Sequence, residues 1–129
     1  VGDVEGTVDV RFPTCVSLQS VKEKLIPAIR KETTLECEVL LDEEPHVVPE
    51  DSEFVKQLLA VYERVEGERG QCIAIGGGTY VHNIEGGVAF GAERGNTDYH
   101  MHGANEFITA DELLKDAVLF AHAIIEVCG

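Results

Sequence analysis

Four stretches of the chain have the apolar pattern of β-strands. Apolar and small side chains occupy every second position from Val4 to Phe12, and Leu35 to Leu41 follows the same period of two. Such alternation gives a strand one buried face and one exposed face. Two short apolar runs, Gln71–Ile75 and Val88–Gly91, predict two further strands.

Three other stretches have the 3.6-residue period of amphipathic helices. In the first, Ser17 or Ser20 is the expected cap, and Pro27 is expected to shorten or kink the helix. In the second, Asp51 or Ser52 is the expected cap and Gly67 the expected end. The predicted apolar faces are Val21, Leu25, Ile26 and Ile29 in the first helix, and Phe54, Val55, Leu58, Leu59, Tyr62 and Val65 in the second.

The last helix is predicted by a capping box, Thr109-Ala-Asp-Glu112, in which the side chain of each end residue bonds the backbone of the other. Its predicted apolar face is Leu113, Leu114, Ala117, Val118, Ala121, Ile124 and Ile125. These elements together predict an α/β fold, because short apolar strands between amphipathic helices are typical of a sheet covered on both faces. Residues 1–42 have the order β-α-β, and an extended segment with Pro45 and Pro49 separates them from the rest.

The chain is strongly acidic, with a net charge of −14 from 24 acidic and 10 basic residues. Nucleic acids and anionic membranes require basic surface, so neither is expected as a partner. No apolar run is long enough for a membrane span, and no signal peptide opens the chain. The cysteines have no metal-binding spacing and are predicted to be buried free thiols of a reducing, cytoplasmic protein; they are Cys15, Cys37, Cys72 and Cys128.

Two stretches that follow predicted strands are candidates for chemistry, since ligands gather at the carboxyl ends of strands. The first is Gly76-Gly77-Gly78-Thr79-Tyr80. Three glycines lose much conformational entropy on folding, which favours either a close backbone approach to an anion or a positive φ. A tight turn is the alternative. The stretch has neither the P-loop pattern nor a third glycine at GxGxxG spacing.

The second stretch is His100-Met101-His102-Gly103-Ala104-Asn105-Glu106. On a strand, His100 and His102 would point the same way and could share a metal, with Asp98 or Glu106 as further ligands. A polar surface loop with one structural histidine is the alternative. Arg11 is a third candidate, because an arginine on a strand suits bidentate binding of a carboxylate. Its alternative is a surface pair with Asp9 or with a glutamate of a neighbouring strand. No Ser-His-Asp arrangement can be assembled.

Several motifs, in register, resemble the PepV-type, carnosinase-like Xaa-His dipeptidases of the aminoacylase-like zinc peptidases. They are Ala74–Tyr80, Gly87–Gly91, His102–Ile108, Val8–Pro13 and Pro45–Ser52. The resemblance covers about residues 4 to 127. It implies that residues 1–44 are the second half of a lid domain with a ferredoxin-like sheet. Residues 45–129 would then be the carboxyl-terminal part of an α/β catalytic domain that holds two zinc ions.

The resemblance also implies roles for four residues. His102 matches the last zinc ligand of the family, Arg11 the lid arginine that grips the substrate's carboxylate, and Gly77 and Gly78 the loop that helps to hold that carboxylate. His100 departs from the family pattern and is not expected to be a ligand. Gly103 stands where the family has a glutamine. The hydrogen bonds that such a side chain would make around the metal ligand are therefore not expected here.

The other zinc ligands and the catalytic glutamate of the family lie upstream, so the chain resembles a carboxyl-terminal fragment with no catalytic residue and at most one zinc ligand. Its expected partner is a dipeptide substrate, and open sheet edges are a possible route to a homo-oligomer. The whole protein would hydrolyse unsubstituted dipeptides with zinc-activated water, and the chain alone would be inactive. Two alternatives stay open: a non-catalytic α/β domain for protein association, and a metal-binding module formed by His100 and His102.

Overall fold

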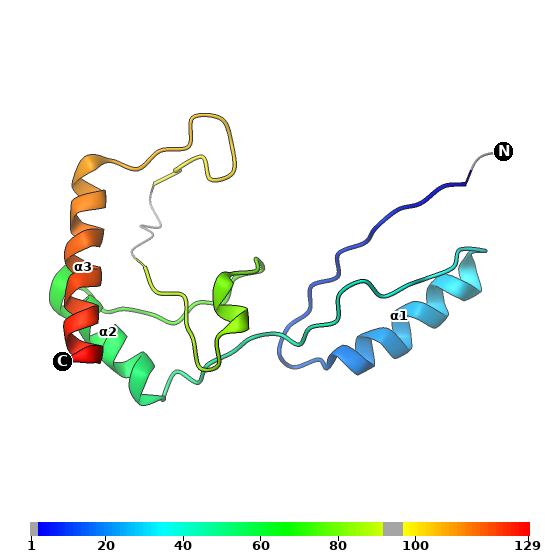
Figure 1. Cartoon of the computed structure of the whole chain (residues 1–129), viewed down its shortest axis with the longest axis horizontal. Helices are drawn as coiled ribbons and strands as arrows, with labels where there is room; N and C mark the ends of the chain where they lie inside the picture. Colours follow the sequence, from blue (N-terminus) through cyan, green and yellow to red (C-terminus); the bar gives the residue numbers. More distant parts are fainter. Residues whose placement is uncertain (1–2, 92–96) are drawn as a thin grey trace. The chain divides into compact units, whose positions relative to one another are not determined.

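Helices are the regular secondary structure of the described chain. The structure is a computed structural model that describes residues 3–91 and 97–129. In chain order the elements are α1 (Leu18–Glu32), α2 (Glu53–Glu66), a short 3-10 helix η1 (Tyr80–Asn83) and α3 (Ala110–Cys128) (Figure 1). The chain divides into two units, Val1–Val47 and Val48–Gly129. None of the helices in the described ranges is long and apolar enough to cross a membrane.

The first unit consists of α1 and the extended segments on either side of it (Figure 1). Of the two predicted caps it is Ser17 that begins α1, because its hydroxyl oxygen accepts the N–H of Ser20 at 3.2 Å. The helix continues past Pro27 to Glu32, so the predicted shortening is wrong. The carboxylate of Glu44 accepts the N–H of Leu18 at 3.1 Å, where the positive end of the helix dipole favours an acid.

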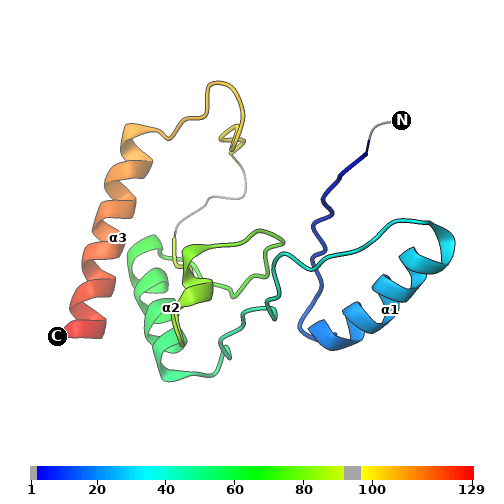
Figure 2. The same ribbon diagram turned by 45° about the vertical axis from the view of Figure 1, so that its right-hand side comes forward.

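The second unit is built on the packing of α2 against α3, which lie alongside each other (Figure 2). Leu58 and Val61 of α2 meet Leu119 and Ala123 of α3 and form the buried core. Tyr62, Val65, Val88 and Phe90 pack against this core. The predicted boundaries of α2 are confirmed: Ser52 caps its start, and Gly67 ends it in the left-handed conformation with φ of 77°.

The α/β fold class predicted from the sequence is wrong for the described chain, including the half of a ferredoxin-like sheet. Residues 4–12, 35–41, 71–75 and 88–91 form no strand in the structure. Alternation specifies which side chains share a face, but a strand exists only when its backbone groups pair with a neighbouring strand. These four segments find no such neighbour among the described residues. The described ranges contain no sheet edge. A homo-oligomer formed through sheet edges therefore stays an untested prediction.

The apolar face predicted for α3 is also largely unpacked. Leu113, Leu114, Ile124 and Ile125 are exposed, with Leu114 at 66% and Ile125 at 67%. Leu119 and Ala123, which lie outside the predicted face, are the buried residues of α3. The reason is that α3 is apolar around most of its circumference, while α2 covers only one side of it.

The four cysteines are free, as predicted, but they are not buried. Cys15, Cys72 and Cys128 are exposed and Cys37 is half-buried. The core is restricted to the contact between α2 and α3, and none of these thiols belongs to it.

Candidate functional site

The loop before α3 carries His102 and is anchored at its base. Across the base, the N–H of Phe107 donates to the carbonyl of Tyr99 at 3.2 Å, and the two rings lie 6.0 Å apart. The hydroxyl of Tyr99 donates to the carboxylate of Glu112 at 2.8 Å. Glu112 also accepts the N–H of Thr109, so the predicted capping box is confirmed and joins the loop to the first turn of α3. Tyr99 lies outside the motifs found in the sequence, and Phe107 lies within His102–Ile108 but had no predicted role.

Three residues of this loop have left-handed backbone although none is glycine. The φ angles of His100, His102 and Asn105 are 55°, 60° and 61°. This conformation is uncommon for residues with a Cβ atom, although asparagine and histidine tolerate it better than most. The N–H of Gly103 closes a turn by donating to the carbonyl of His100 at 2.8 Å. His100 and His102 therefore lie on a turn and not on the strand that would point them the same way.

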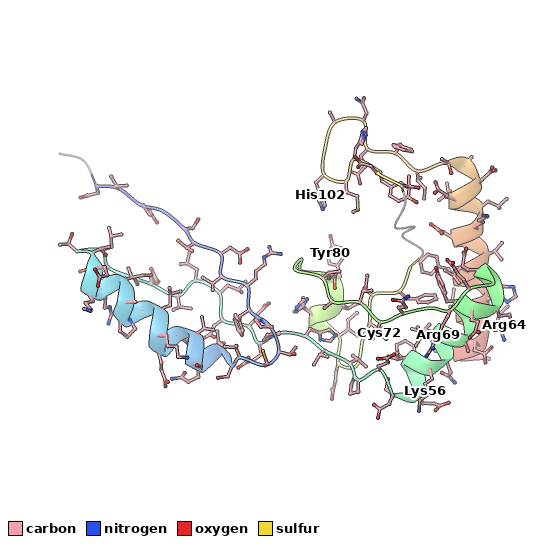
Figure 3. The ribbon with its side chains drawn as sticks, turned by 180° about the vertical axis from the view of Figure 1, so that it is seen from behind. Lys56, Arg64, Arg69, Cys72, Tyr80 and His102 are labelled. Carbon is pink, nitrogen blue, oxygen red and sulfur yellow. The ribbon has the colours of Figure 1, made fainter. Side chains whose placement is uncertain are left out.

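The two histidines have different surroundings. The ring of His100 lies edge-on to Phe107, with centroids 5.9 Å apart. The ring of His102, labelled in Figure 3, forms no hydrogen bond, ion pair or ring contact with a described residue. The hydrogen bond that His102 makes is donated by its backbone N–H to Glu106. Both residues are exposed, but the imidazole of His100 packs on Phe107 of its own loop, whereas the imidazole of His102 has no described partner. This difference disfavours a metal site shared by both.

The described residues do not form a complete metal site. No group of three or more His, Cys, Asp or Glu side chains in residues 3–91 and 97–129 is placed to hold an ion. A zinc site takes three or four protein ligands. His102 fits the role of one ligand by its chemistry and exposure, and the described chain does not supply the others.

The triple glycine lies before η1, in unit 2. Among the glycines that the structure describes, Gly67 and Gly86 have positive φ, so the triple glycine does not need the left-handed conformation. A Cβ atom added to Gly76 or Gly78 would meet nothing within 4 Å. Neither the backbone angles nor packing against described residues explains why these two positions are glycine. Tyr80, directly after them, is 94% exposed (Figure 3).

Arg11 lies in the first unit and pairs with a neighbouring acid. Its Nε and Nη2 atoms donate to Oδ2 of Asp9 at 3.2 and 3.0 Å. Both side chains are more than half exposed. This is the surface pair that the sequence offered as the alternative role of Arg11. An exposed pair of this kind is worth only about 0–1 kcal/mol, so it does not prevent Arg11 from binding another carboxylate.

A separate hollow of about 240 Å³ lies beside α2 and contains none of the predicted site residues. Lys56 and Arg69, both labelled in Figure 3, line it together with Glu50 and Glu63. Two basic and two acidic side chains line the hollow, so its charge favours neither an anion nor a cation. It therefore identifies no ligand.

Known proteins similar to this chain are dipeptidases by name. Over 84 residues the chain is 48% identical to the Beta-Ala-Xaa dipeptidase of Lactobacillus delbrueckii subsp. lactis, a match of 65% of this chain and 18% of the relative. Over 119 residues it is 33% identical to "Putative dipeptidase YtjP" of Bacillus subtilis, 92% of this chain and 25% of the relative. Over 121 residues it is 30% identical to "Putative dipeptidase SH1171" of Staphylococcus haemolyticus, 94% of this chain and 26% of the relative.

The chain belongs to this dipeptidase family. The resemblance noted from the Gly76–Tyr80 and His102–Glu106 motifs is confirmed at the level of the family. The chain spans between 18% and 26% of the length of these three dipeptidases. No protein-family model and no solved structure matches it significantly.

Proposed function

We propose that this chain is the carboxyl-terminal, substrate-binding part of a metal-dependent dipeptidase that hydrolyses unsubstituted dipeptides. The observation that carries the proposal is the 48% identity over 84 residues to a Beta-Ala-Xaa dipeptidase. Its substrate class, a peptide with a free carboxylate, is one that an arginine can bind with two parallel hydrogen bonds.

We assign His102 as one ligand of a zinc site whose other ligands lie outside the described residues. Its exposed imidazole, with no partner in the described chain, supports this role. Bound zinc would supply an activated water for attack on the peptide carbonyl. The chain alone is expected to be inactive, since the described residues provide one ligand and no complete site.

We assign a carboxylate-binding role to Arg11 in the first unit and, independently of it, to Gly77 and Gly78 in the second unit. The pair with Asp9 is exposed and weak, so a substrate carboxylate could replace Asp9 at Arg11. The open space around Gly78 leaves its backbone accessible to a ligand. We also place the protein in the cytoplasm, because exposed thiols such as Cys72 stay reduced there.

The experiment is a comparison of His102→Ala and Arg11→Ala in the full-length protein that contains this chain. His102→Ala should lower bound metal, measured by elemental analysis, and lower kcat. Arg11→Ala should leave the metal content unchanged. It should raise KM for dipeptides by roughly 10- to 150-fold, because a hydrogen bond to a charged group contributes about 1.5–3 kcal/mol. His122→Ala and Arg30→Ala, which remove the same side-chain types from exposed helix positions, serve as controls. Normal metal content in His102→Ala together with normal KM in Arg11→Ala would overturn both assignments.

A further inference from the structure

The turn that presents His102 is held by an acid four residues later. Oε2 of Glu106 accepts the backbone N–H of His102 at 3.2 Å. The bond reaches the left-handed residue itself and spans Asn105, which is also left-handed. A side-chain acceptor of this kind stabilises a backbone conformation that the residue would otherwise visit rarely.

Asp98 also bonds a histidine amide, but from the other side: its Oδ1 accepts the N–H of His100, two residues later, at 3.0 Å. Each of the two histidines thus has its amide held by an acid of the same loop, but His102 is the one whose imidazole has no described partner. The pair provides an internal comparison: both histidines are exposed, but the ring of His100 packs on Phe107 and the ring of His102 contacts no described ring.

We propose that Glu106 is a positioning residue, which fixes the direction of the His102 imidazole by accepting its backbone N–H. This rests on the proposed role of His102 as a metal ligand. Glu106 acts through the amide and does not touch the metal or the substrate. Hydrogen-bond partners that orient the side chain of a metal ligand commonly change metal affinity by about 10- to 100-fold when they are replaced, and we take this range as the expected size of the effect.

The test measures metal affinity of the full-length protein and, separately, exchange of the His102 amide hydrogen in the metal-free protein. Glu106→Ala should lower zinc affinity by about 10- to 100-fold and speed amide exchange at His102. Glu106→Gln keeps an oxygen that can accept the N–H, so both quantities should stay close to the wild-type values. Asp98→Ala is the matched control and should speed amide exchange at His100 while leaving zinc affinity unchanged.

Two results would overturn the inference. If Glu106→Gln lowers zinc affinity as much as Glu106→Ala, the carboxylate itself binds the metal and positioning is wrong. If Glu106→Ala leaves zinc affinity unchanged while His102→Ala lowers it, His102 is a ligand that Glu106 does not orient. Failure of the proposed function is distinguishable from both, because His102→Ala would then leave zinc affinity unchanged whatever the amide exchange shows.

Discussion

The helices α1 and α2 have similar sequence patterns but very different burial. Both are amphipathic, both are capped by a serine, and both end near basic residues. Yet α2 buries Val55, Leu58 and Val61, while α1 has no buried residue. The difference is the partner: α2 packs on α3, whereas the first unit offers α1 only extended segments. An apolar stripe therefore indicates which face of a helix can be buried. The face becomes buried only when another element packs against it.

The largest expected effect tests the contact between α2 and α3. Leu119 is fully buried, so Leu119→Ala should lower the free energy of unfolding by about 2–5 kcal/mol through lost burial and a cavity. Urea denaturation of the 129-residue chain, followed by circular dichroism, would measure this change.

Two matched leucines provide the control. Leu114→Ala lies on the exposed side of the same helix, and Leu25→Ala lies on α1 at 36% exposure. Each should cost well under half as much as Leu119→Ala, because each loses less buried area. If Leu114→Ala and Leu119→Ala lower the free energy of unfolding equally, the face of α3 that carries Leu114 is buried in solution. That result would contradict the difference in burial between the two faces.

A smaller effect is expected at the start of α3. Thr109→Ala removes the acceptor for the N–H of Glu112, which lies 3.2 Å from the threonine hydroxyl, at an expected cost of about 0.5–2 kcal/mol. Amide exchange in the first turn of α3 should become faster. Ser17→Ala removes the corresponding cap of α1, and amide exchange at Ser20 should become faster. Unchanged amide exchange in the first turn of α3 after Thr109→Ala would contradict the role of the capping box.

The smallest effect is expected for the ion pair between α2 and α3. Arg64 and Glu126 are 2.8 Å apart but both partly exposed, so Arg64→Ala should cost only about 0.2–1 kcal/mol. The cost should shrink as salt is raised, since exposed charges are screened. Lys22→Ala, which removes the pair with Asp42 in the first unit, is the control. A cost for Arg64→Ala that is large and independent of salt would show that the arginine contributes mainly through packing of its stem.

The family, both ends of α2 and the start of α3 could be predicted from the sequence, and the geometry of the candidate site could not. The motif around His102 identified the family because residue types in a fixed order are present in the sequence itself. The left-handed angles of His100, His102 and Asn105 were not predictable in this way, because glycine is the usual signal for a positive φ. The bond from Glu106 to the amide of His102 depends on those angles and was missed with them.

The sequence alone determined both ends of α2, at Ser52 and Gly67, and the start of α3 at Thr109. Caps and capping boxes bond groups within about four residues, so their information is local. Tertiary structure decided which side of α3 is buried and whether the alternating segments become strands. Both outcomes depend on a partner far away in the sequence: α2 covers the Leu119 side of α3, and the segment 4–12 meets no strand among the described residues.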